Sequence, residues 1–196
     1  MRFYKFISTI LHPIVIPTIT VMLYFLLVPN TIVSSQKLTI LSLIFTITYL
    51  IPLLILILFK KLKIIKNYQT NSIKERKLPM ALMIVLFYLL GNTISNIGNL
   101  SHLFYATSLG LLLIYILFFF NIKASVHLLS LGLFISFFMV ISILYAQSYI
   151  LLITIIFLLS GILASARLNL KAHTTKEIYI GFFIGIMAPF LVYAIL

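Results

Sequence analysis

The sequence contains no cysteine and no tryptophan, and only two of its 196 residues are acidic. Without cysteine there is no disulfide, no thiolate nucleophile and no cysteine-based zinc site. Hard divalent cations need several oxygen ligands, so two carboxylates argue against a metal site, and we expect no cofactor. Charged residues make up 8% of the chain, against about a quarter in a typical soluble domain.

Apolar side chains, in contrast, account for 63% of the residues. A water-soluble fold could not cover so much apolar surface, so the bilayer must be the solvent for most of the chain. A spanning helix needs about 20 mostly apolar residues and satisfies its own backbone polar groups. Such runs occur at 7–28, 38–59, 79–96, 102–121, 126–147, 149–165 and 177–196. The predicted fold class is all-α, a polytopic transmembrane helix bundle of about seven spans (six to seven).

The formal net charge of +12 is distributed unevenly across this predicted topology. The side of the membrane that holds the N-terminus also holds 13 of the 14 lysines and arginines: Arg2, Lys5, Lys60, Lys61, Lys63, Lys66, Lys74, Arg76, Lys77, Lys123, Arg167, Lys171 and Lys176. The opposite side holds only Lys37. Because cytoplasmic loops are enriched in Lys and Arg, we predict that the basic side is cytoplasmic.

The partners expected from this composition are lipids. No basic helix or aromatic platform accompanies the positive charge, so we expect attraction to anionic lipid headgroups and not to nucleic acid. The chain reads as a single membrane-embedded domain over 1–196, without a soluble domain. Gly181 and Gly185 form a GxxxG pair, a pattern typical of close helix packing.

The chemically richest stretch of the chain is 165–177. His173 and Glu177 are four residues apart, so on a helix the carboxylate can reach one ring nitrogen and leave the other free to attack. Arg167 offers a planar fork suited to two phosphate oxygens. Glu177 also completes a capping box with Thr174, and this role is compatible with a histidine partner.

A second candidate segment is 121–127. Ser125 is a good N-cap for the following helix, and His127 would then lie in the first turn. The backbone N–H groups of a helix N-terminus attract anions, and a histidine there can donate a proton to a leaving oxygen. The alternative is an interfacial histidine that is hydrogen-bonded to a neighbour.

The third candidate segment is 74–79, which contains Lys74, Arg76 and Lys77. These cations either neutralise phosphate or form a topology-setting basic loop that touches lipid headgroups. Glu75 follows Ser72 by three residues, and we interpret it as a helix cap. The two remaining histidines, His12 and His102, receive no role.

Taken together, the three segments resemble the three motifs of the type 2 phosphatidic acid phosphatase superfamily, in the same order. Ser165-x-Arg167-x5-His173-x3-Glu177 resembles the third motif, Ser-Arg-x5-His-x3-Asp. Ala124-Ser125-Val126-His127 resembles the second, Pro-Ser-Gly-His, and the basic segment that ends at Pro79 resembles the first. The resemblance covers roughly 66–196, which would be the phosphatase-like core, and leaves 1–59 as accessory N-terminal spans.

The resemblance implies a metal-independent phosphatase or phosphotransferase acting on a membrane lipid phosphate or prenyl diphosphate. His173 would attack phosphorus to form a phosphohistidine, Glu177 would orient it, and His127 would protonate the leaving alcohol. The phosphate oxygens would be held by Arg167, Ser125, Arg76, Lys77 and Lys74. Two alternatives stay open: a non-catalytic relative that binds anionic headgroups, and a small transporter.

Overall fold

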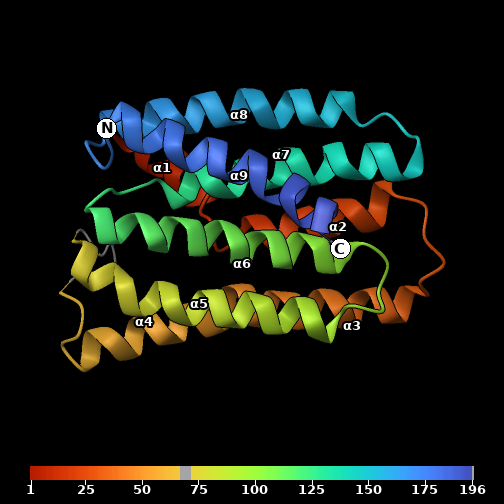
Figure 1. Cartoon of the computed structure of the whole chain (residues 1–196), viewed down its shortest axis with the longest axis horizontal. Coiled ribbons are helices and arrows are strands. Elements are labelled where there is room, and N and C mark those ends of the chain that lie inside the picture. The colour runs from red at the N-terminus through yellow and green to blue at the C-terminus, as the bar shows by residue number, and fades with distance from the viewer. Residues whose placement is uncertain (67–71, 196) are drawn as a thin grey trace.

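The computed structural model describes residues 1–66 and 72–195, and no strand occurs in these ranges. The helices form one elongated bundle (Figure 1). They are α1 (Arg2–Ile10), α2 (Ile16–Leu27), α3 (Ser34–Phe45), α4 (Ile51–Lys61), α5 (Ile73–Thr93), α6 (Leu100–Leu117), α7 (Val126–Tyr145), α8 (Ile150–Asn169) and α9 (Thr175–Ile195). A π-helical turn, η1 (Thr46–Leu50), joins α3 to α4, and a 3-10 turn, η2 (Phe118–Phe120), extends α6.

Five helices of the described chain are long and apolar enough to cross a bilayer. They are Ser34–Lys61, Leu100–Phe120, Val126–Tyr145, Ile150–Asn169 and Thr175–Ile195. The chain is therefore an integral membrane helix bundle, as its composition predicts. The predicted count of seven spans is not confirmed, because the first and third apolar runs do not form helices of this kind.

The first apolar run, 7–28, is divided between two helices. The chain leaves the helical path at 11–15, where Pro13 cannot donate a backbone hydrogen bond. With 12 residues, α2 is only about 18 Å long, whereas the hydrocarbon core is about 30 Å thick. The break turns α1 into a separate amphipathic helix at one end of the bundle.

The third apolar run, 79–96, lies mostly in α5, which begins earlier, at Ile73. Its first turns carry charged side chains, so α5 is less apolar than the five spanning helices. The hydroxyl of Ser72 accepts a hydrogen bond from the backbone N–H of Glu75 at 3.3 Å. The predicted cap is confirmed, and the Glu75 carboxylate also accepts a hydrogen bond from the N–H of Lys66 at 3.3 Å.

The centre of the bundle is α7, which is buried along most of its length and crosses α9 closely. A Cβ added at Gly132 would lie 2.6 Å from the Phe182 carbonyl oxygen and 3.1 Å from Gly185 Cα. The hydroxyl of Ser136 donates a hydrogen bond across the interface to the Gly185 carbonyl at 3.0 Å. The predicted glycine pair is therefore a packing element that lets the two backbones meet.

The segments with most of the basic residues lie at the same end of the bundle. That end, at the left in Figure 1, contains the N-terminus, the end of α4, the start of α5, the α6–α7 connection and the α8–α9 connection. The α2–α3, α5–α6 and α7–α8 connections lie at the opposite end. We call the first of these the basic end.

Candidate active site

A cavity of about 1050 Å³ is lined by residues from all three segments singled out in the sequence. Arg76 comes from α5, His127 from α7 and Arg167 from α8, while His173 lies between α8 and α9. The other basic and histidine side chains in the lining are Lys5, His12, Lys123 and Lys171. No acidic residue of the described chain lines it, so the cavity favours an anion.

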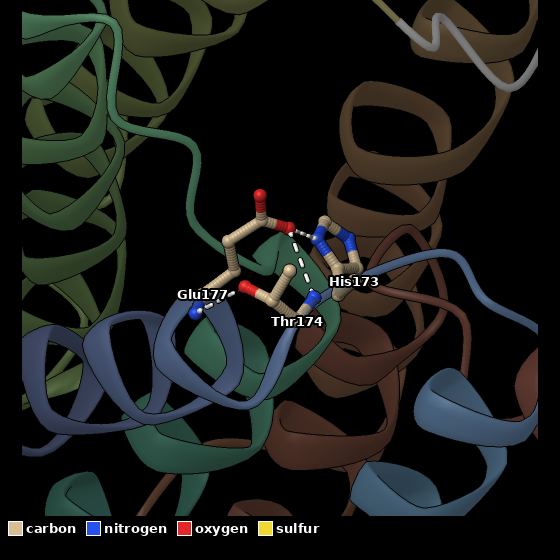
Figure 2. A network of polar contacts seen from close by, with 3 residues as sticks. All are labelled: His173, Thr174 and Glu177. Atoms are coloured by element: carbon tan, nitrogen blue, oxygen red, sulfur yellow. Dashed lines mark hydrogen bonds and ion pairs between the residues drawn. The ribbon is translucent and has the colours of Figure 1, made fainter.

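The His173 side chain is only 2% exposed, and its Nδ1 lies 2.6 Å from Oε2 of Glu177. The same oxygen accepts a hydrogen bond from the backbone N–H of Thr174 at 3.4 Å. The Glu177 N–H in turn donates to the Thr174 hydroxyl at 3.4 Å. Figure 2 shows this network, in which the second ring nitrogen of His173 points away from the carboxylate. The capping box and the histidine partner predicted for Glu177 therefore coexist.

The environment of His173 favours the neutral imidazole. Burial lowers its pKa below the usual value of 6.5; the hydrogen bond to Glu177 opposes this shift, and the positive charges of Arg167 and Arg76 reinforce it. In the neutral ring, Nδ1–H donates to the carboxylate, and Nε2 keeps its lone pair. This is the protonation state that a nitrogen nucleophile requires.

A backbone contact joins the start of α7 to the start of α9. The N–H of Ser125 donates to the Glu177 carbonyl at 2.9 Å, and a Cβ at Gly181 would overlap the Ser125 carbonyl oxygen. Ser125 occupies the N-cap position, but its hydroxyl makes no capping bond, is buried without a partner in the described chain, and does not line the cavity. The expected capping bond is thus absent, and the residue contacts α9 through its backbone.

His127 lies in the first turn of α7, as predicted, and lines the cavity. Its Nε2 is buried and has no hydrogen-bond partner among the described residues. A buried polar atom without a partner costs free energy, so this nitrogen, on a residue of the cavity lining, is a candidate ligand contact. A phosphoryl or leaving-group oxygen would satisfy it.

Arg167 is held by the first helix of the chain. Its Nη1 donates to the hydroxyl of Ser8 at 2.9 Å, whereas its Nε is buried without a partner among the described residues. Arg76 is half-buried and lines the same cavity. Two arginines from different helices therefore contribute to the wall of one cavity.

Two of the predicted phosphate ligands lie elsewhere. Lys74 is exposed and does not line the cavity. The ammonium nitrogen of Lys77 lies 5.1 Å from the centroid of the Phe119 ring, also outside the cavity lining. Successive residues of a helix point about 100° apart, so Arg76 can enter the cavity while its neighbours in the sequence do not.

His12 is the site residue to which the sequence assigned no role. It lies in the turn between α1 and α2, and its ring is edge-on to that of His127, with centroids 5.1 Å apart and an interplanar angle of 78°. The sequence feature that could have identified His12 is its position within an apolar run, since ionisable residues at membrane depth are costly. His102 lies in the first turn of α6, at the opposite end of the bundle.

Comparison of the chain with protein-family models, curated proteins and solved structures finds no match. A function is therefore inferred from the arrangement of the cavity residues and from the chemistry that they support.

Proposed function

We propose that the protein is a membrane-embedded lipid phosphate phosphatase or phosphotransferase that works through a phosphohistidine, as the motif resemblance implies. One observation carries the proposal. A buried, carboxylate-paired histidine, a second histidine with an unpaired nitrogen and two arginines line one cavity, although they come from segments far apart in the chain.

The shape of the cavity supports a lipid as the bearer of the phosphate. On α5 the lining residues are Arg76, Pro79, Met80, Met83 and Phe87, which occupy one helix face. From residue 76 to residue 87 the helix rises about 16 Å, roughly half the hydrocarbon thickness. The cavity thus joins a cationic end to an apolar wall, which suits an anionic headgroup with a hydrocarbon tail.

In the first step, Nε2 of His173 forms a bond to phosphorus while the bond from phosphorus to the leaving oxygen breaks. Glu177 orients the ring and stabilises the positive charge that develops on it. His127, protonated when the anionic phosphate is bound beside it, gives its proton to the leaving oxygen. Arg167 and Arg76 stabilise charge on the phosphoryl oxygens during the transfer.

In the second step, water attacks phosphorus, and the bond between phosphorus and Nε2 breaks to release inorganic phosphate. His127, now neutral, takes a proton from the attacking water. An alcohol in place of water would give phosphotransfer. A hydrogen bond from Ser125 to a phosphate oxygen stays a prediction, as do contacts from Lys74 and Lys77.

We also propose that the site faces the cytoplasm of a bacterial inner membrane. The charge asymmetry of the sequence supports this orientation, because the basic end carries the residues that the positive-inside rule places in the cytoplasm. Labelling of single cysteines, added to this cysteine-free chain at Lys61 and at Lys37, tests the orientation in intact cells.

The deciding experiment measures phosphate release from phosphatidate and from a prenyl diphosphate by detergent-purified protein, with and without chelator. We expect turnover that persists in chelator, is lost in His173→Ala and is retained in the matched control His102→Ala. An acid-labile phosphoenzyme should form in the wild type. Unchanged turnover in His173→Ala would eliminate the mechanism, and headgroup binding without turnover would favour a non-catalytic lipid-binding protein.

A further inference from the structure

The N-terminal helix α1 presents two different surfaces. Phe3, Phe6 and Ile10 are exposed large apolar side chains, whereas Ser8 is 8% exposed. The helix packs against α8, the helix that carries Arg167. An amphipathic helix in this position can rest its apolar side in lipid and turn its polar side toward the cavity.

The polar side of α1 fixes one edge of the Arg167 guanidinium. A phosphate is bound bidentately through two neighbouring N–H groups of the arginine fork. The Ser8 hydroxyl occupies Nη1, and the buried Nε has no partner among the described residues, so an anion bound bidentately would use the edge that contains Nε. In that case Ser8 would select the guanidinium edge that meets the substrate.

The turn after α1 restricts the ring of His127 in a similar way. Nδ1 of His12 accepts a hydrogen bond from the N–H of Ile14 at 3.4 Å, so in the neutral ring of His12 the proton is on Nε2. That ring packs edge-on against His127, whose own Nε2 has no partner among the described residues. Both imidazoles line the cavity.

We propose that segment 2–15 is a functional part of the active site, in which Ser8 positions the Arg167 fork and His12 positions the His127 ring. This inference rests on the proposed phosphoryl-transfer function and deepens it. It assigns a role to a part of the chain that lies outside the three motif-like segments. Ser8 and His12 are positioning residues, because each acts through a side chain that would touch the phosphoryl group.

The first test uses the small number of histidines. Only four occur in the chain, so side-chain NMR of protein labelled with ¹⁵N-histidine can resolve each one in detergent micelles. We expect His12→Gln to shift the ring signals of His127 without any ligand, and the matched control His102→Gln to leave them in place. Unchanged His127 signals in His12→Gln would overturn the inference, whether or not the protein is an enzyme.

The second test adds inorganic phosphate to the labelled wild-type protein. The signals of His12, His127 and His173 should shift together, and that of His102 should not. A response of His127 and His173 without His12 would overturn the inference and leave the proposed function intact. If no histidine responds and no lipid phosphate is hydrolysed, the proposed function fails, and the His12→Gln spectra alone decide whether the two rings are coupled.

The third test is kinetic. Ser8→Ala should lower kcat/KM roughly 10-fold, mainly through KM, because a hydrogen bond to a charged group is lost and the arginine is freed. Ser8→Thr, which keeps the hydroxyl, should recover most of it, and Ser34→Ala on the exposed start of α3 should match the wild type. If His173→Ala abolishes activity but Ser8→Ala is as active as the wild type, the positioning role of Ser8 is overturned.

Discussion

The two acidic residues of this protein offer a matched experiment, because both follow a helix-capping hydroxyl by three residues. Glu177 pairs with Thr174 at the start of α9, and Glu75 pairs with Ser72 at the start of α5. Only Glu177 also contacts a histidine, with 2.6 Å between Oε2 and Nδ1 of His173. Comparing Glu177→Gln with Glu75→Gln therefore separates the histidine contact from the cap.

The capping contribution to stability should change by a similar amount in the two variants. Glutamine also completes a capping box, and each variant loses one negative charge near a helix N-terminus, about 0.3–1 kcal/mol. The activity change should differ. A charge-assisted hydrogen bond to a buried partner contributes about 1.5–3 kcal/mol, so Glu177→Gln should reduce kcat/KM roughly 10- to 100-fold. The activity of Glu75→Gln should stay within about twofold of the wild type, because its carboxylate contacts the Lys66 N–H and does not line the cavity.

The assay is phosphate release by detergent-purified protein, combined with thermal unfolding of each variant. Activity of Glu177→Gln within twofold of the wild type would refute the orienting role of this carboxylate. An equal loss of activity in Glu75→Gln would also refute it, because the loss would then follow from capping. Normal unfolding temperatures exclude misfolding as the cause of a loss.

Glu177→Gln should also shift the pH dependence of activity in a defined direction. Burial holds the pKa of His173 below 6.5, and Glu177 raises it from the value that burial alone would produce. Activity that requires neutral His173 should fall as the pH drops through this pKa, and the acid limb of the kcat/KM profile should move to lower pH in Glu177→Gln. The neutral, buried His173 also contributes stability above about pH 6.5, and this contribution is lost as the pH falls below the unfolded value.

Two further predictions test the geometry of the site. Arg76→Gln should raise KM about 10-fold or more, because Arg76 lines the cavity. The neighbouring substitution Lys77→Gln should change KM by less than twofold, because Lys77 lies against Phe119. Equal effects on KM would instead place both cations in one diffuse basic surface. Gly181→Ala should cost about 1–3 kcal/mol of unfolding free energy and reduce activity, because the new Cβ overlaps the Ser125 carbonyl. Gly161→Ala, with no atom within 4 Å of its Cβ, should be neutral or stabilising by up to about 1 kcal/mol in the same thermal assay.

Local features of the chain were readable from the sequence because their causes are local. Apolar runs predicted a membrane helix bundle, since only a bilayer can solvate them. The spacing of three residues in the two capping boxes and of four residues between His173 and Glu177 follows directly from helix geometry. Alternation of helices across the membrane then gathered most of the cations at one end of the bundle.

What the tertiary structure alone decided is which side chains share the cavity. The rotation of α5 about its axis places Arg76 in the wall and Lys77 against Phe119. The break near Pro13 brings His12 onto His127, and the close crossing of α9 and α7 buries the Ser125 hydroxyl. Each outcome depends on packing between segments far apart in the chain, which no short-range spacing encodes.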